Sequence, residues 1–209
     1  MKKITFFLAI LCLFGCEKKN NSPTRAPQIN PFAQYLSDNG ANVTVTFHNN
    51  DYPLEIGYTF TASDTGIINQ IGLRLPGGRE DFFVTLWDAQ TQKLLVQKQV
   101  HCFYDTAFSY FDLAATNESV GIQANHTYLI SVNLTPAPGP IQPVTPLPIN
   151  YYDVRRTDQK DIFPMTESYI TYLHQYNKIT TTPAFPDNLI IYQDFINGIV
   201  DIGFSHVSK

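Results

Sequence analysis

One Asp-Thr-Gly triplet, Asp64-Thr65-Gly66, stands out in the chain because paired-aspartate proteolysis uses a carboxylate in this setting. That chemistry requires two such carboxylates that share one proton, supplied by two lobes or two chains. The sequence contains a single copy, and the run from Ser63 to Gly66 also has the composition of a tight turn between two strands. We therefore interpret the triplet as a turn.

Hydrolysis of glycosidic bonds is a second chemistry that acidic residues permit, and it needs two carboxyl groups about 5 to 10 Å apart across a cleft. Six carboxylates of the part expected to fold are candidates: Asp81, Asp88, Asp105, Asp112, Glu118 and Asp153. No spacing among them singles out a pair. The sequence therefore names no catalytic residue, and a carbohydrate-active hydrolase stays the alternative to a non-catalytic protein.

The five histidines of the chain are scattered, at His48, His101, His126, His174 and His206. No two are spaced i,i+2 or i,i+4, and the His-Glu-x-x-His motif is absent, so the spacing indicates no zinc site. The run Asn49-Asn50-Asp51 is rich in oxygen ligands, although it lacks the spacing of an EF-hand loop. We expect no cofactor and leave open one structural calcium ion.

Cysteine usage separates the start of the chain from the rest. Cys12 and Cys16 lie near the N-terminus, so Cys102 is alone in the part expected to fold. A single thiol forms no internal disulfide, and the fold must be held by packing. Cys102 lies in an apolar run and is expected to be buried. A nucleophilic role with His101 is disfavoured because neighbours on a strand point to opposite faces.

Aromatic side chains are abundant, with 12 tyrosines and 15 phenylalanines. Exposed tyrosine rings stack on apolar faces of ligands such as sugars, while their hydroxyls tolerate water. Five tyrosines lie in the half of the chain with the weakest pattern and are the candidate ligand-binding residues: Tyr151, Tyr152, Tyr169, Tyr172 and Tyr176. Packing in the core and at its rim is the alternative explanation for these rings.

Composition limits the class of protein. The chain has 209 residues, of which 44% are hydrophobic and 15% charged, with a formal net charge of -4. This apolar content and small net charge argue against disorder. The acidic balance argues against nucleic acid as a partner, because phosphate binding needs clustered lysine and arginine. We expect a monomer with one folded domain.

Period-two alternation dominates from residue 41 onward and predicts strands. Val43, Val45 and Phe47 alternate with polar residues, and similar runs recur near residues 56–60, 128–134 and 199–207. Residues 82–87 are apolar on both faces and predict a central strand, while residues 165–176 are strand or irregular. The Pro-rich stretch 135–150 predicts an excursion in polyproline II conformation. We therefore expect an all-β fold over 41–209, an antiparallel β-sandwich resembling a jelly roll, with a closed barrel as second choice.

The N-terminus carries the most specific signal. A short basic start precedes an uncharged run from Ile4 to Phe14, too short to span a bilayer, and the run ends in Leu13-Phe14-Gly15-Cys16. This resembles the lipoprotein signal of bacteria. The resemblance implies a signal peptide over 1–15, cleavage before Cys16, and acylation of its thiol and its new amine. An ordinary secretory signal with an incidental cysteine is the alternative.

The lipoprotein resemblance also implies an address. Residues 16–40 would be an acylated cysteine and a flexible tether, because this stretch is polar and lacks apolar periodicity. Glu17, rather than aspartate, follows the cysteine, and aspartate there retains enterobacterial lipoproteins at the inner membrane. We therefore expect a lipid-anchored protein of the outer membrane, on either its periplasmic or its outer side.

Short motifs in the folded part resemble those of an uncharacterised bacterial β-sandwich domain, the domain-of-unknown-function family 4082. They are Tyr58-Thr59-Phe60-Thr61-Ala62, Gly66-Ile67-Ile68, Leu86-Trp87-Asp88, Leu94-Leu95, Asn125-His126-Thr127-Tyr128 and Val200-Asp201-Ile202-Gly203-Phe204, preceded by a Phe-Pro segment. The resemblance implies a sandwich in a secreted setting, and it offers no established catalytic residues to carry over to this chain. The sequence thus predicts a non-catalytic binding or structural module whose partner is a glycan or another envelope protein.

Overall fold

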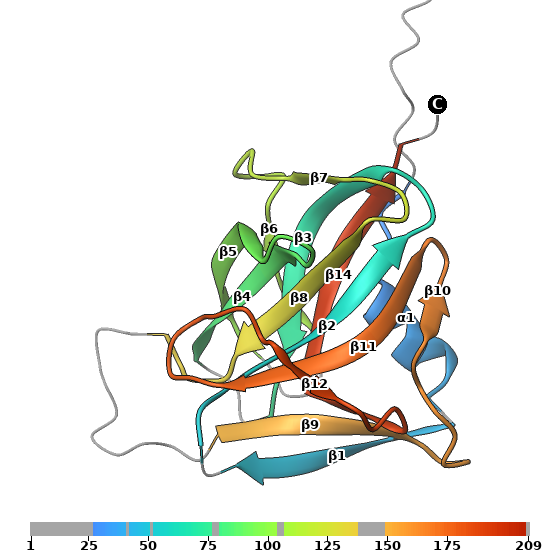
Figure 1. Cartoon of the computed structure of the whole chain (residues 1–209), viewed down its shortest axis with the longest axis vertical. Helices are drawn as coiled ribbons and strands as arrows, with labels where there is room; N and C mark the ends of the chain where they lie inside the picture. Colours follow the sequence, from blue (N-terminus) through green and yellow to red (C-terminus); the bar gives the residue numbers. More distant parts are fainter. Residues whose placement is uncertain are drawn as a thin grey trace, which may run out of the picture.

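The computed structural model describes residues 27–40, 42–50, 52–76, 80–103, 107–137 and 149–207 (Figure 1). In these ranges one short helix and fourteen strands occur, in the order α1 (Pro31–Asp38), β1 (Val43–Asn50), β2 (Leu54–Ala62), β3 (Gly66–Arg74), β4 (Asp81–Asp88), β5 (Lys93–His101), β6 (Ser109–Asp112), β7 (Val120–Ile122), β8 (Thr127–Asn133), β9 (Ile149–Arg156), β10 (Met165–Glu167), β11 (Ile170–Ile179), β12 (Asn188–Ile190), β13 (Phe195–Asn197) and β14 (Ile199–His206). The predicted all-β class is confirmed.

The strands form three antiparallel sheets. The largest has the order β10-β11-β2-β8-β4-β5, with β12 paired to β11. A second sheet has the order β14-β3-β6, with β7 also on β3, and the third has the order β1-β9-β13. The sheets pack against one another as a sandwich, which confirms the predicted architecture.

Alternation within the strands explains the core. In β2, the apolar side chains of Ile56, Tyr58 and Phe60 alternate with small or polar ones, and all three are buried. Tyr58 joins two sheets, because its hydroxyl donates to the carbonyl of Gly198 at 3.0 Å and accepts from the amide of Val200 at 2.6 Å. The strand predicted over residues 82–87 is β4, which lies between β8 and β5.

The segment expected to be a flexible tether is folded in its second half. Helix α1 lies within residues 16–40. Ile29, two residues before the helix, pairs with Phe204 of β14. The helix was missed because eight residues provide too few turns for a clear apolar period. Phe32 is fully buried, stacked on Tyr58 with ring centroids 5.6 Å apart. Any tether therefore ends before this helix.

Several predictions lie outside the described residues. They concern Cys16 and the signal peptide, Asp51, Asp105, and residues 138–148 of the Pro-rich excursion. Residues 165–176, left between strand and irregular structure, form β10 and most of β11. Cys102 is buried, as expected, and its thiol lies 3.6 Å from the carbonyl oxygen of Leu75.

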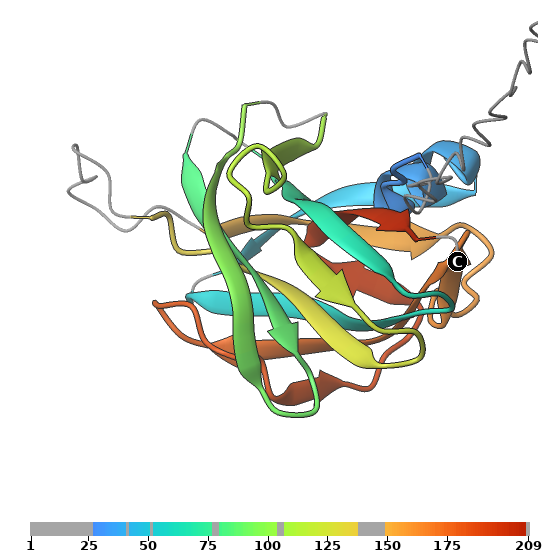
Figure 2. The ribbon, with the colours of Figure 1, turned by 90° about the horizontal axis from the view of Figure 1, so that it is seen from above.

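One buried carboxylate joins the helix to the sheets. Asp201 of β14 accepts the backbone amides of Phe32 and Ala33, at 3.0 Å each, from the first turn of α1. It also accepts the hydroxyls of Tyr110 at 2.8 Å and Tyr172 at 3.2 Å, and its third backbone donor is Ile202 at 2.8 Å. Viewed from above, α1 lies beside β14 (Figure 2).

The hydrogen bonds compensate the cost of burying this charge. Burial raises the pKa of Asp201 to about 6, while the donated hydrogen bonds oppose the rise. A buried carboxylate without partners would cost several kcal/mol, and removal of its oxygens leaves the donors unsatisfied in turn. Asp201 is thus the tertiary cap of an otherwise uncapped helix, because Asn30 makes no capping bond with its side chain.

Removal of this cap should destabilise the fold. We expect Asp201→Ala to lower the free energy of unfolding by about 3 kcal/mol or more, because two amides and two hydroxyls lose their acceptor in the core. Urea denaturation followed by circular dichroism measures the loss. Tyr110→Phe is the matched control, which removes one donor and should cost about 1 kcal/mol. A loss below about 1 kcal/mol for Asp201→Ala would contradict this assignment.

Candidate functional site

An open groove of about 790 Å³ lies on the face of the sheet β1-β9-β13. Its lining combines the ends of β1 and β9, the turn that follows β9, and the segment that precedes β13. These residues are Thr44, Thr46, Arg155, Arg156, Thr157, Gln159, Asp161, Ile191, Tyr192, Gln193 and Asp194. We refer to them as the polar groove.

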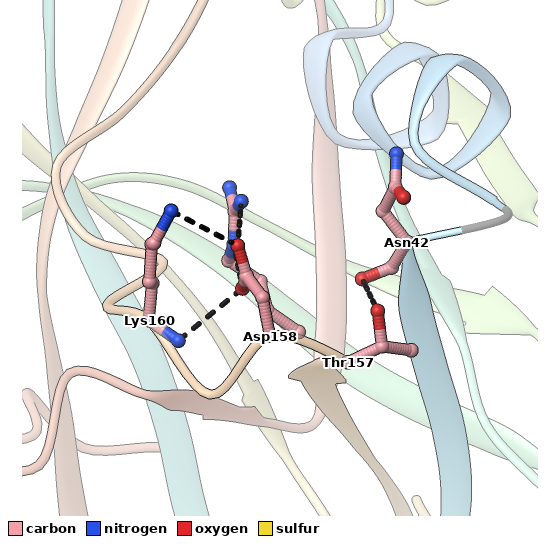
Figure 3. A network of polar contacts seen from close by, with 5 residues as sticks. Asn42, Thr157, Asp158 and Lys160 are labelled. Carbon is pink, nitrogen blue, oxygen red and sulfur yellow. Dashed lines mark hydrogen bonds and ion pairs between the residues drawn. The ribbon is translucent and has the colours of Figure 1, made fainter.

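Local hydrogen bonds hold the two walls of the polar groove. The backbone amide of Ile162 donates to the carbonyl of Gln193 at 2.6 Å and so ties the turn after β9 to the segment before β13. Thr157 donates through both its amide and its hydroxyl to the carbonyl of Asn42 (Figure 3). The groove is therefore a pre-formed feature of the fold.

Asp158 organises the turn. Arg156 donates two hydrogen bonds to it, at 2.8 and 2.7 Å, and Lys160 approaches it with both its backbone amide and its ammonium (Figure 3). The Arg156 guanidinium holds the pKa of Asp158 well below its usual range. The charge of Arg156 is consequently paired within the protein, whereas Arg155, the other cation of the groove lining, lies over an aromatic ring.

Arg155, Phe195 and Tyr192 form a stack beside the groove. The guanidinium carbon of Arg155 lies 4.9 Å from the centre of the Phe195 ring, on the neighbouring strand. The ring of Tyr192 stacks on Phe195 with centroids 6.0 Å apart and planes 24° apart, and 62% of Tyr192 is exposed. An exposed aromatic ring is thus held in place next to the planar polar groups of Arg155, Gln193 and Asp194.

The five tyrosines predicted to bind a ligand are not gathered in one place. Tyr172 is fully buried and Tyr151 is 6% exposed; Tyr151 lines a hollow of about 520 Å³ with Tyr52 and Asn197. Tyr176 lines a different hollow, of about 480 Å³, with Phe185. Tyr152 lies under the guanidinium of Arg74, and Tyr169 packs against His206.

The carboxylates considered for hydrolysis have other partners. Asp81 and Asp88 lie 2.8 and 2.9 Å from the ring nitrogens of His101 and His126, and Glu118 pairs with Lys98. Of that set, no described member lines the polar groove, whose two carboxylates are Asp161 and Asp194. Among the described residues, no group of three or more His, Cys, Asp or Glu side chains is placed to hold a metal ion.

Sequence reasoning missed Tyr192, Arg155, Asp161 and Asp194. An available signal was the run from Leu189 to Tyr192, where apolar residues interrupt a region without strand alternation. Leu189, Ile191 and Tyr192 are 46%, 74% and 62% exposed, so this run is a surface feature. Exposed apolar clusters of this kind mark surfaces that contact a ligand or partner.

A second polar cluster is buried beneath the segment 180–187. Glu55 of β2 is fully buried, and its Oε1 accepts the hydroxyl of Ser131 at 2.5 Å. The same hydroxyl oxygen accepts the indole N–H of Trp87 at 2.9 Å. Phe185 covers Trp87 with an edge-to-face contact at 5.8 Å, and Lys178 pairs with Asp187 at 2.8 Å at the end of the segment.

Burial raises the pKa of Glu55 to about 7. The Ser131 hydroxyl, the Asn133 amide and the backbone amide of Ala184 draw the pKa down, but the second oxygen, Oε2, has no hydrogen bond of good geometry. Ionisation of this group therefore opposes folding near neutral pH. Glu55, Ser131 and Trp87 line none of the hollows described above, so we treat these three residues as part of the core.

Comparison with known proteins adds no relative: no family model matches the chain, and no curated protein matches it. The resemblance to family 4082 stays a prediction that rests on its short motifs. Among the described residues, no helix has the length and apolar character needed to cross a bilayer.

The titration of Glu55 predicts a pH-dependent stability. Its pKa in the folded protein, about 7, lies above the ordinary 4.5. The contribution of the protonated carboxyl group to the free energy of unfolding is therefore fully present below about pH 4.5 and is lost as pH rises through 7. Relative to Glu55→Gln, the wild-type free energy of unfolding should fall by about 3 kcal/mol across this window. Urea denaturation of both proteins at several pH values measures the difference, since all other titrating groups are shared. If the free energies of unfolding of the two proteins changed in parallel with pH, the raised pKa of Glu55 would be refuted.

Proposed function

We propose that the chain is a lipid-anchored protein of the bacterial envelope whose sandwich binds a glycan in the polar groove. The single observation that carries the glycan proposal is the position of Tyr192, exposed and stacked on Phe195 at the side of a pre-formed groove. Binding sites of this kind combine an apolar surface with a few polar groups that fix orientation.

The groove offers two complementary contacts to a sugar. The face of the Tyr192 ring matches the C–H face of a pyranose, and its hydroxyl remains in water. Arg155, Gln193 and Asp194 present planar donors and acceptors that match pairs of neighbouring sugar hydroxyls. Arg155 supplies donors only and Asp194 acceptors only, so a neutral or weakly charged glycan meets both without repulsion.

The envelope location is supported by the N-terminal sequence. The uncharged run that ends in Leu13-Phe14-Gly15-Cys16 resembles a lipoprotein signal, and two or three acyl chains at Cys16 would anchor the protein stably. The described fold begins near residue 27, which leaves about ten residues between the anchor and the sandwich. The outer membrane is the favoured address because Glu17 follows the cysteine.

A carbohydrate-active hydrolase is the second candidate function. One observation favours it: Asp161 and Asp194, from different segments, line the same groove. Hydrolysis would need one carboxyl group as acid and the other as base or nucleophile on opposite sides of the glycosidic bond. Shorter products after prolonged incubation of a bound glycan with the protein would establish the hydrolase in place of the binding module.

Tyr192→Ala tests the glycan proposal. An array of bacterial and plant oligosaccharides selects a ligand, and isothermal titration calorimetry measures its affinity. We expect a loss of about tenfold, because the stacking face is removed while the groove persists. Phe103→Ala is the matched control, since Phe103 is also an exposed ring, 63% accessible, and lies outside the groove. Equal affinities of the two variants, or binding to no glycan on the array, would count against the proposal.

Cys16→Ser tests the anchor. The thiol is the expected point of diacylglycerol attachment, so the variant should move from the membrane fraction to the aqueous phase in detergent phase separation. Cys102→Ser is the control, because its buried thiol has no part in acylation and the variant should stay with membranes. Retention of the Cys16 variant in the detergent phase would contradict lipid anchoring through this residue.

A further inference from the structure

Strand β1 is a long, open sheet edge. It is eight residues long and lies at the end of the sheet β1-β9-β13, with β9 as its neighbour on one side (Figure 1). Its pairing with β9 runs from Val43 to Asn50 without a bulge. Among the described residues, no strand pairs with the opposite side of β1, whose row of backbone groups could accept another strand.

The other described edges are protected. β10 and β13 have three residues each, and β6 has four. β5 carries Lys93 and Lys98, and β14 is flanked by the bridge to Ile29 and by α1. Short length, charge and cover are the usual means by which proteins prevent pairing at an edge. β1 is eight residues long, its sequence VTVTFHNN contains no charged residue and no proline, and no described strand covers its outer edge.

The side chains of β1 indicate an unfinished layer. Val43, Val45 and Phe47 lie on the face shared with the buried Val154 and Ile196, yet both valines are only half-buried and Phe47 is 59% exposed. One further strand beside β1 would continue this apolar row and cover it. The exposed edge and the exposed row thus point to the same missing neighbour.

We propose that β1 of a second copy of this chain is that neighbour, so that two sandwiches join through one continuous sheet. A twofold axis perpendicular to the sheet makes the strands antiparallel and keeps like faces together. In the register centred on Val45, Val43 faces Phe47 of the second copy and Thr44 faces its Thr46. Pairs of β-branched and aromatic residues, and of threonines, are favourable across antiparallel strands.

Electrostatics permits this occupant. No charge of either sign lies on β1, so the two strands meet without repulsion. The nearest described cations on the adjacent strand, Arg155 and Arg156, would be separated from their counterparts by three strand spacings, or about 14 Å. This exceeds the screening length of about 8 Å at physiological ionic strength. This proposal differs from the monomer expected from the sequence, and the experiment below decides between the two.

Phe47→Lys tests the dimer, because it removes part of the apolar row and places a charge on the edge. Sedimentation velocity of the full chain in density-matched detergent, over a range of concentrations, measures association. We expect dimers for the wild type. For Phe47→Lys we expect weaker association, with a dissociation constant at least tenfold larger. Phe103→Lys is the matched control, since it introduces the same change at an exposed ring in the loop after β5, away from β1, and should dimerise like the wild type.

Two results would overturn the proposal. The first is a monomeric wild type at all concentrations, which would leave the edge for a partner of different sequence. The second is equal association of Phe47→Lys and the wild type, which would place the interface elsewhere. Circular dichroism confirms that each variant is folded. Neither position lines the polar groove, so the outcome is independent of glycan binding.

Discussion

The fold depends on a buried carboxylate that binds three other elements at one point. Asp201 of β14 receives the first amides of α1, the hydroxyl of Tyr110 from β6 and the hydroxyl of Tyr172 from β11. A charge in this position is tolerated only because each oxygen has several donors. The dependence is mutual, because the amide of Phe32 and the hydroxyl of Tyr172 are buried and have Asp201 as their acceptor.

This constraint extends to the surface through the order of the chain. Asp201 fixes the start of α1, and α1 is joined to β1 by a short connection. β1 supplies Thr44 and Thr46 to the polar groove and, on its other side, the open edge. The capped helix, the proposed ligand site and the proposed dimer edge are therefore neighbours along the chain, and the pairing of β1 with β9 holds the last two in place.

The sequence predicted the strands, because alternation of apolar and polar residues encodes them. It did not predict helix α1, which depends on contacts between residues far apart in the chain. The period-two runs in β2, β8 and β14 predicted the strands and the sandwich, because one buried face leaves a pattern in the sequence. Helix α1 leaves too short a pattern, and its stability comes from Phe32 in the core and from Asp201, about 170 residues away.

The candidate site was less predictable for the same reason. Tyrosine is often found at the surface, yet Tyr172 is buried and its hydroxyl donates to Asp201 in the core. No local spacing in the sequence reveals this contact. Tyr192 follows the three-residue strand β12, where neither alternation nor helical period exists, and only the contact with Phe195 fixes its orientation. A groove built from three distant segments has no signature in any one of them.

Hydrogen exchange at the backbone amides of Phe32 and Ala33 tests most directly whether Asp201 makes the helix part of the cooperative fold. We expect these amides to exchange as slowly as those of β14, through global unfolding. Opening the helix alone would remove two hydrogen-bond donors from a buried carboxylate. Exchange of both amides much faster than β14 would show that α1 opens by itself, and would contradict the central role given to Asp201.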